Sequence, residues 1–207
     1  MISGSGTNLQ AIIDAVKQGR IDANIAAVIS NRADARGLQR ARRENINTAV
    51  IDQNEYPDRI AYDEALIAEI DKYNPDLVVL AGFMRILSDT FISHYDDAIL
   101  NIHPSLLPDF KGLHTHRRAL ESSKQVHGAS VHFVNNELDS GLVVLQAQVP
   151  VLPGDTEETL GKRVLQQEHI IYPMAIAWYI EGRLKVIDNK VLLDNNILHR
   201  PVLWKEN

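Results

Sequence analysis

The 207-residue sequence contains no cysteine. This absence excludes disulfide frameworks, zinc sites with Cys ligands, iron–sulfur clusters and thiol catalysis. It fits a reducing cytoplasm, which is where we expect the protein to work. Aromatic residues make up only 6% of the chain, and no stretch of about 18 apolar residues occurs. We therefore expect no membrane-spanning helix, and the opening residues predict no secretory signal.

Excess positive charge is also missing, since 21 Lys and Arg face 27 Asp and Glu for a net charge of −6. The densest basic spots, Arg40 with Arg42 and Arg43 and then Arg117 with Arg118, are interpreted as solvated helix faces. The sequence thus lacks the basic footprint of a nucleic-acid-binding protein, and we expect neither a nucleic-acid nor a membrane partner. With 45% apolar residues, a chain of this length is expected to form one domain.

Short apolar strands alternate with amphipathic helices through the first hundred residues. Strands are expected at 25–30, 47–52 and 76–82, and helices at 34–45 and 58–73. The strand at 76–82 is almost continuously apolar, as in a strand covered on both faces. This alternation predicts an α/β fold with a parallel sheet and right-handed crossovers.

The turn chemistry changes after about residue 98, where we expect three more strands, a long helix and a terminal hairpin. The helix is expected to start with a capping box of Asp155 and Glu158 and to stop near Gly182. The strands are expected at 98–103, 129–134 and 142–149, and the hairpin at 185–193 through Asp188 and Asn189. The predicted fold is Rossmann-like: a mostly parallel twisted sheet with helices on both faces, and a C-terminal part with an antiparallel strand and a long helix.

A glycine-rich turn, Ser-Gly-Ser-Gly-Thr-Asn at 3–8, opens the first helix. Glycines let backbone N–H groups approach an anion, and a helix N-terminus favours negative charge, so this turn is a candidate phosphate site. It lacks the Lys of a P-loop and the third glycine of a dinucleotide fingerprint. A plain tight turn is the alternative.

The most unusual stretch is Asn-Ile-His-Pro-Ser-Leu-Leu-Pro at 101–108. Asn101 and His103 are two apart on a strand and so point to one face, at the carboxyl end where open α/β sheets bind ligands. An amide and an imidazolium together can stabilise an oxyanion. Asp139, in the loop at 135–141, is a candidate partner whose carboxylate would favour charged His103. The alternatives are a core histidine and an ordinary Asp-Ser-Gly turn.

Two other chemistries receive less support. His114, His116, His127 and His132 invite a metal site, but no Cys or close carboxylate completes one, so we interpret them as hydrogen-bonding residues and expect no metal. No Gly-x-Ser-x-Gly motif is present, which disfavours a hydrolase triad.

Taken together, six segments resemble one family from residue 2 to about 185. They are Ser-Gly-Ser-Gly-Thr-Asn-Leu-Gln (3–10), Leu-Ala-Gly-Phe-Met-Arg-Ile-Leu (80–87), Asn-Ile-His-Pro-Ser-Leu-Leu-Pro (101–108), Gly-Leu-His-Thr-His (112–116), His-Gly-Ala-Ser-Val-His-Phe-Val (127–134) and Glu-Leu-Asp-Ser-Gly (137–141). In this order and spacing they resemble the phosphoribosylglycinamide formyltransferases, folate-dependent enzymes of purine biosynthesis.

The resemblance implies one domain over 1–207, with a phosphate-binding half at 1–100 and a half at 101–207 that carries folate and catalytic residues. It implies direct transfer of the formyl group of 10-formyltetrahydrofolate to the amine of 5′-phosphoribosylglycinamide, without a metal. Family members are monomers or homodimers. We expect the loops at 110–127 and 135–141 to move over the folate.

Residue by residue, the resemblance implies three groups. The catalytic group is Asn101, His103 and Asp139. The group that binds phosphoribosylglycinamide is Gly6, Thr7, Asn8, Leu165, Gln166, Gln167 and Glu168. The group that binds the folate is Arg59, Met84, Arg85, Ile86, Leu87, Asn101, Asn135, Asn136, Glu137, Leu138 and Asp139.

One departure and three alternatives accompany this interpretation. The family's first strand is reduced here to Met1 and Ile2, so we expect the chain to be trimmed relative to the working protein. Methionyl-tRNA formyltransferase shares several motifs but usually has a further domain and a basic surface, and formyltetrahydrofolate hydrolase usually has a regulatory domain. A non-catalytic Rossmann-type nucleotide-binding module would have no use for Asn101, His103 and Asp139 together.

Overall fold

The structure is a computed structural model that describes residues 1–136, 139 and 141–205. Its α-helices are α1 (Thr7–Lys17), α2 (Arg36–Arg43), α3 (Arg59–Ile70), α4 (Asp89–His94), α5 (Thr115–Glu121) and α6 (Glu157–Ile180), with 3-10 turns η1 (Gln53–Glu55) and η2 (Asp71–Tyr73). Its strands are β1 (Ala27–Ser30), β2 (Asn47–Val50), β3 (Val78–Leu80), β4 (Ile99–His103), β5 (Val126–Phe133), β6 (Val143–Pro150), β7 (Leu184–Ile187), β8 (Lys190–Leu193), β9 (Asn196–Ile197) and β10 (Val202–Trp204).

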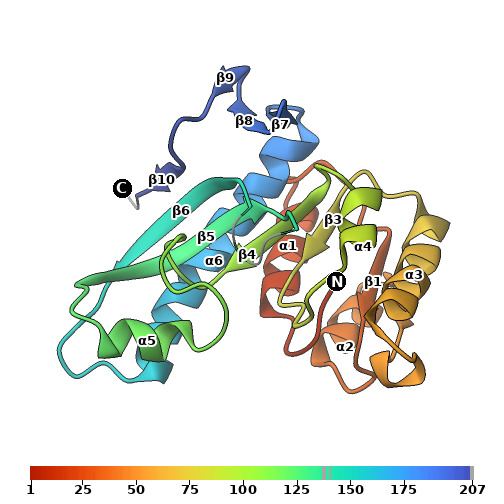
Figure 1. The fold of residues 1–207 in the computed structure, drawn as a ribbon, viewed down its shortest axis with the longest axis horizontal. Coiled ribbons are helices and arrows are strands. Elements are labelled where there is room, and N and C mark those ends of the chain that lie inside the picture. Colours follow the sequence, from red (N-terminus) through yellow and green to blue (C-terminus); the bar gives the residue numbers. More distant parts are fainter. Residues whose placement is uncertain (137–138, 140, 206–207) are drawn as a thin grey trace.

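The main sheet is mixed, with a parallel first half. Strands β1 and β2 pair in parallel, and a second group runs in the order β10-β6-β5-β4-β3. Residues 1–3 lie between the two groups, because Ile2 N–H donates to the Ile29 carbonyl (3.0 Å) and Ala81 N–H donates to the Met1 carbonyl (2.9 Å). β3 and β4 are parallel, whereas β5 is antiparallel to both β4 and β6. The predicted fold class is thereby confirmed (Figure 1).

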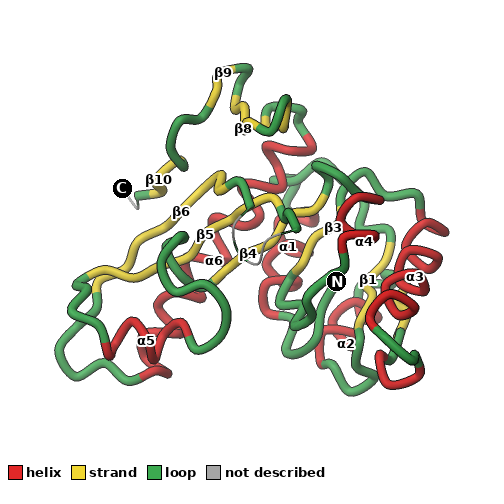
Figure 2. The backbone as a smooth tube through the Cα atoms, in the orientation of Figure 1, coloured by secondary structure: helices red, strands yellow, loops and turns green. Residues whose placement is uncertain are grey.

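Helices cover both faces of the sheet. Alternate strand residues point to opposite faces, so Val28 enters the core under α1, α2 and α6, whereas its neighbour Ile29 enters a second core under α3 and α4. β4 enters both cores in the same way, with Leu100 in the first and Ile99 in the second. The other face of β5 instead buries Ser130 and His132, which bond Leu107 N–H and the Asn101 amide. The β7–β9 hairpins stand apart from the main sheet at the top of the view in Figure 2. None of the helices in the described ranges has both the length and the apolar character needed to cross a membrane.

Helix α6 is tied to the sheet by one buried phenol. The Tyr172 side chain is fully buried, and its hydroxyl lies 2.8 Å from the Leu100 carbonyl and 3.1 Å from the Leu80 carbonyl. Those carbonyls belong to β4 and β3, the two strands that end at the candidate site. The hydroxyl therefore fixes where α6 crosses behind the sheet.

Replacing Tyr172 by Phe should reduce the free energy of unfolding by about 1–3 kcal/mol, because the buried carbonyls lose their donor and no water replaces it. Tyr179→Phe is a matched control on the same helix, since its hydroxyl bonds the Asp76 carbonyl (3.2 Å) in an exposed position. Urea unfolding of both variants checks this. Equal destabilisation by the two substitutions would contradict the role given to Tyr172.

The structure corrects the predicted start of the long helix. Thr156, not Asp155, is the N-cap, and it forms a reciprocal capping box with Thr159. Asp155 instead pairs with Arg163 (2.8 Å) and accepts the Leu152 N–H. The hairpin through Asp188 and Asn189 is confirmed, with both residues at positive φ. Helices α4 and α5 and strand β10 were not predicted, because segments of three to seven residues are too short to show a periodicity.

Candidate active site

The carboxyl end of β4 presents Asn101 and His103 on one face, as their spacing predicts. In the register of the antiparallel pair, Asn101 lies opposite His132 of β5 and His103 lies opposite Ser130. His103 is 5% exposed and His132 is 2% exposed, while Asn101 is half-buried. The strand pair thus places an amide and two imidazoles close together at the carboxyl end of β4.

His103 is held by the loops on either side of it. Its Nδ1 lies 3.4 Å from the Asp139 carboxylate, and its Nε2 lies 3.1 Å from the Phe110 carbonyl. The same Asp139 carboxylate accepts the Gly112 N–H at 2.8 Å. Both imidazole nitrogens therefore face oxygen acceptors, an arrangement that the doubly protonated ring satisfies. The predicted trio of Asn101, His103 and Asp139 is brought together.

His132 is a member of this cluster that the sequence did not assign to it. Its Nδ1 donates to the Phe133 carbonyl (3.0 Å), so its Nε2 is the acceptor for the Asn101 amide group at 3.1 Å. Burial lowers the pKa of His132, which favours this neutral tautomer. His132 therefore fixes which way the Asn101 amide points, and no other described residue accepts its second N–H. The pairing of β4 with β5 brings His132 to Asn101, and that pairing cannot be read from the sequence.

Gly141 allows the Asp139 loop to approach β5. A Cβ built on Gly141 would lie 1.7 Å from the Phe133 carbonyl oxygen and 3.1 Å from His132 Nδ1. No side chain fits there without displacing the strand. Asp139 itself has φ 47°, a left-handed conformation that Asp tolerates better than most residues. Its neighbours Glu137, Leu138 and Ser140 lie outside the described residues.

The glycine loop opens α1 as predicted. Gly6 is the N-cap with φ 69°, and no side chain in the described ranges caps the helix, so its first N–H groups can meet a ligand. Asn8 donates its amide N–H to Glu168 of α6 at 2.7 Å. Burial raises the pKa of Glu168, and the hydrogen bond from Asn8 opposes that effect. The structure therefore brings together two predicted substrate residues that lie 160 positions apart.

The remaining predicted substrate residues on α6 are more exposed than Glu168. Gln166 is exposed on α6, while Leu165 and Gln167 are half-buried. Within the described part of the chain, no hydrogen bond joins these three to the glycine loop or to the trio. Arg59, predicted to bind folate, is exposed at the start of α3 and likewise has no such bond to another candidate.

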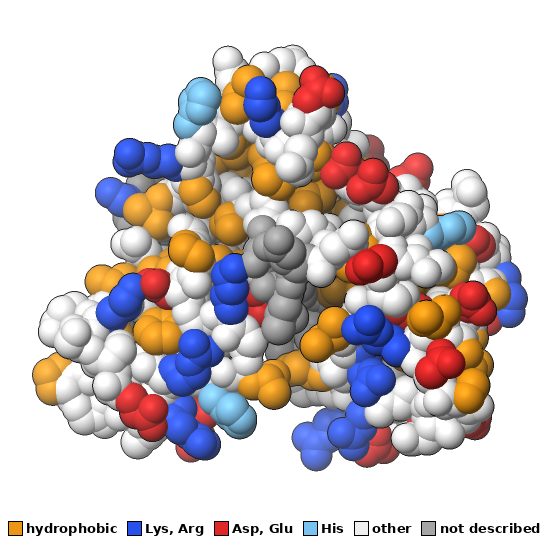
Figure 3. Space-filling view, in the orientation of Figure 1, with side chains coloured by type: hydrophobic (Ala, Val, Ile, Leu, Met, Phe, Trp, Pro, Cys, Tyr) orange, Lys and Arg blue, Asp and Glu red, His pale blue; other side chains and the backbone are white. Residues whose placement is uncertain are grey.

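The predicted folate residues after β3 include two exposed apolar side chains. Met84 is 71% exposed and Ile86 is 58% exposed, whereas the Leu87 side chain lies in the core. Met84 and Arg85 line a cavity of about 600 Å³ together with Ser3 and residues 31–34 and 52–54, and none of the trio is among its lining residues. In the space-filling view, Lys and Arg side chains lie on both sides of the hollow between α5 and α2 (Figure 3). Asn135 and Asn136, also predicted folate residues, are exposed just beyond β5.

His116 and His127 form a buried pair behind the His103 loop. Nδ1 of His116 lies 3.1 Å from Nε2 of His127, and the His127 ring is packed edge-on against Phe110. Burial lowers the pKa of His116 and lowers that of His127 to about 4. In residues 1–136, 139 and 141–205, no three His, Cys, Asp or Glu side chains lie where they could share a metal ion. The His116 and His127 rings hydrogen-bond to each other.

Acidification should therefore destabilise the protein. The unfolded chain protonates His127 near pH 6.5, whereas the folded chain holds it neutral down to about pH 4. Below pH 6.5 the unfolded state binds more protons, so stability falls as the pH falls, by on the order of 3 kcal/mol for this residue. Urea unfolding at pH 7.5, 6 and 5 measures the slope. His127→Gln should flatten it and the exposed-site control His199→Gln should not; equal slopes would contradict the assignment.

The sequence is similar to a known family and to proteins of known name. The formyl transferase family matches residues 1–176. The phosphoribosylglycinamide formyltransferase of Escherichia coli is 57% identical over 198 residues, which are 96% of this chain and 93% of that protein. The enzyme of the same name from Haemophilus influenzae is 48% identical over the same shares of the two chains.

Solved structures agree with the sequence comparison. The phosphoribosylglycinamide formyltransferase of Coxiella burnetii superposes with a TM-score of 0.94 at 49% identity and covers 99% of this chain and 96% of its own. Glycinamide ribonucleotide transformylase 1 of Symbiobacterium toebii gives a TM-score of 0.90 at 50% identity, over 93% of this chain and 91% of its own. The family match and these likenesses show that the chain belongs to the formyl transferase family.

Proposed function

We propose that this chain transfers the formyl group of 10-formyltetrahydrofolate to the amine of 5′-phosphoribosylglycinamide, forming formylglycinamide ribonucleotide in purine biosynthesis. The observation that carries the proposal is the cluster of Asn101, His103 and Asp139 at the end of β4, in a chain 57% identical to a phosphoribosylglycinamide formyltransferase. The folate is a co-substrate, and no step requires a metal.

The reaction begins when the glycinamide amine attacks the formyl carbon, and negative charge develops on the formyl oxygen. Asn101 donates its free amide N–H to that oxygen, because His132 holds the other one. His103 donates Nε2–H after the formyl oxygen takes the place of the Phe110 carbonyl. A charged donor of this kind is stronger than a neutral one and acts where charge develops.

The Asp139 carboxylate has two roles, one beside His103 and one in proton transfer. Its carboxylate, 3.4 Å from His103 Nδ1, is placed to accept the Nδ1–H and to lie opposite positive charge on the ring. The proton lost by the attacking amine is relayed through water at Asp139 to the folate nitrogen that leaves. Holding both substrates in one cleft supplies a further effective molarity, worth up to about 7–11 kcal/mol.

The two substrates occupy opposite sides of this cluster. Gly6, Thr7 and Asn8 bind the phosphate at the N-terminus of α1. The glycinamide end is contacted by a second group on α6, namely Leu165, Gln166, Gln167 and Glu168. The folate lies against the loop after β3 and the loop after β5, with its outer part towards Arg59. The residues proposed to contact the folate in these two loops are Met84, Arg85, Ile86, Leu87, Asn135, Asn136, Glu137 and Leu138.

The wider assignments follow from this function. Residues 1–100 and 101–207 work as one domain, an inference supported by the Asn8–Glu168 hydrogen bond between the two halves. The partners are small molecules, without nucleic acid or membrane, and the protein is a monomer or homodimer in the cytoplasm. Size-exclusion chromatography with light scattering decides between the two oligomeric states.

A spectrophotometric assay tests the function. The protein is mixed with 10-formyltetrahydrofolate, and release of the deformylated folate is followed with and without phosphoribosylglycinamide. The proposal predicts release only when the amine is present. Release at the same rate without the amine would instead support a formyltetrahydrofolate hydrolase, and no release in either mixture would contradict the proposal.

A further inference from the structure

Helix α2 packs directly against the glycine loop. Gly37 N–H donates to the Gly4 carbonyl at 3.1 Å, and a Cβ on Gly6 would lie 2.5 Å from Gly37 Cα. Only glycine at both positions permits this approach. One turn further along α2, the half-buried Arg40 is thereby carried to the side of the loop.

The Arg40 guanidinium is fixed in place by two hydrogen bonds. Its Nε donates to the Ser5 carbonyl at 2.9 Å, and its Nη1 donates to the Gln10 side chain at 3.2 Å. Nη2 makes no hydrogen bond to any residue in the described ranges. The planar group is therefore pre-oriented, with donors left over. Its position corrects our interpretation of Arg40 as part of a solvated helix face.

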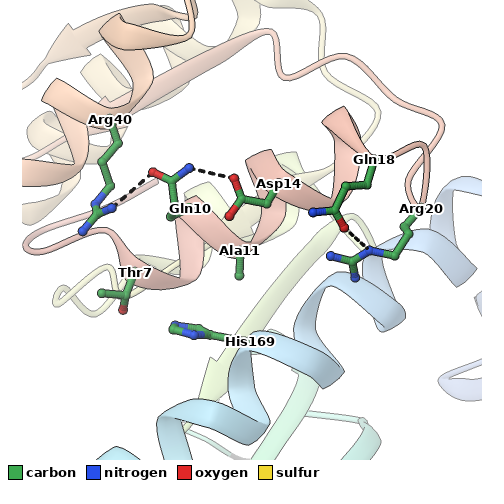
Figure 4. Close-up of a pocket in the computed structure, with 8 residues that line it drawn as sticks. All are labelled: Thr7, Gln10, Ala11, Asp14, Gln18, Arg20, Arg40 and His169. Carbon is green, nitrogen blue, oxygen red and sulfur yellow. Dashed lines mark hydrogen bonds between the residues drawn. The ribbon is translucent and has the colours of Figure 1, made fainter.

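A cavity of about 350 Å³ lies beside this arginine. Arg40 and Gln10 line one side, His169 of α6 lines the other, and Thr7 lies between them (Figure 4). Burial and the nearby Arg40 charge lower the pKa of His169, and its Nε2 has no partner among the described residues. Thr7, Arg40 and His169 thus border the same cavity, near the start of α1.

The charged lining residues determine which kind of ligand suits the Thr7 end of the cavity. Asp14 also lines it, but lies seven residues along α1, about 10 Å from Thr7, and is bonded by Gln10 (2.9 Å). At that end Arg20 also lines the cavity, so the charges of Asp14 and Arg20 oppose each other, whereas Arg40 supplies positive charge at the Thr7 end. A phosphate monoester carries about −1.5 to −2 charge, and the glycine loop contains no Lys or Arg of its own.

We propose that Arg40 binds the 5′-phosphate of the amine substrate and makes the enzyme select phosphorylated acceptors. This inference rests on the proposed function, because it concerns the same acceptor. The guanidinium meets the phosphate from the side while the α1 N-terminus and Thr7 meet it end-on. Arg40 supplies the cation that a P-loop would supply with its lysine.

The test compares acceptors with and without the 5′-phosphate, phosphoribosylglycinamide and ribosylglycinamide, on the full chain. Arg40→Gln should lower the ratio of their kcat/KM values about 10- to 100-fold, chiefly through a higher KM for the phosphorylated acceptor. Arg40→Lys should restore most of the ratio. Arg43→Gln is the matched control, an exposed arginine on the same helix that should keep the wild-type ratio. Equal loss for both acceptors in Arg40→Gln would mean that Arg40 only holds the loop, and would overturn the proposal.

A binding measurement separates this proposal from the proposed function. Calorimetric titration with ribose 5-phosphate requires no turnover. Wild type and Arg43→Gln should bind it equally, and Arg40→Gln should bind it at least about 10-fold more weakly. Equal affinity in Arg40→Gln and wild type would overturn the role of Arg40. Absence of formyl transfer by a wild-type protein that shows this binding difference would overturn only the proposed function.

Discussion

Asp139→Asn should lower kcat by 100-fold or more, a loss of about 2.7 kcal/mol of transition-state stabilisation. The substitution preserves shape, so the Asn oxygen can still accept the Gly112 N–H that the carboxylate accepts at 2.8 Å. Only the negative charge beside His103 is removed. The imidazolium then loses its counter-charge, and the proton relay loses its carboxylate. Steady-state kinetics of the purified variant give the kcat.

Binding of the amine substrate is the internal control for this variant. The proposed phosphate site lies on α1, so the affinity for phosphoribosylglycinamide should stay close to wild type when measured by calorimetry. Asp109→Asn is a matched control in the neighbouring loop, where the carboxylate pairs with Lys124 on the surface. It should keep wild-type kinetics. A near wild-type kcat in Asp139→Asn would refute the role given to Asp139.

His103→Asn should lower kcat about 100- to 1,000-fold, because the transition state loses a charged donor at the formyl oxygen. Asn101 remains in place in this variant, since its amide is held by His132 at 3.1 Å and not by His103. The residual rate should reflect Asn101 and the binding of both substrates. The double variant with Asn101→Ala should therefore fall below the single variant.

Two observations check the interpretation of His103. The exposed His199→Asn should leave kcat at the wild-type value and excludes a general effect of removing a histidine. Circular dichroism and urea unfolding should show that His103→Asn remains folded. A folded variant with more than a tenth of wild-type kcat would be incompatible with His103 as the main electrostatic catalyst.

The sequence predicted the parts of the fold that local physics determines. The near-continuous apolar strand at 76–82 predicted a sheet covered on both faces, and the two-residue spacing of Asn101 and His103 predicted that both lie on one face. The link between His103 and Asp139 was less accessible. Thirty-six positions separate them, and no local pattern brings the loop after β5 back to the end of β4. From the residues alone Asp139 was a candidate partner with an ordinary turn as the alternative, and the family resemblance then implied its catalytic role.

Long-range contacts account for what the sequence did not predict. His132 orients Asn101 through antiparallel register, and Arg40 reaches the glycine loop because Gly6 and Gly37 let two segments touch. Both side chains resemble ordinary residues of a strand and a helix in the sequence alone. The Thr156 cap was missed for a local reason, since Asp155 and Thr156 both suit an N-cap and the Arg163 pair drew Asp155 away.

The fate of the formyl carbon tests the central claim most directly. The wild-type protein is given 10-formyltetrahydrofolate labelled with carbon-13 in the formyl group, together with phosphoribosylglycinamide, and the products are followed by NMR. Direct transfer predicts that the label appears as a formamide on the glycinamide nitrogen as fast as folate is released. Label accumulating as free formate, with the amine substrate unchanged, would contradict the account.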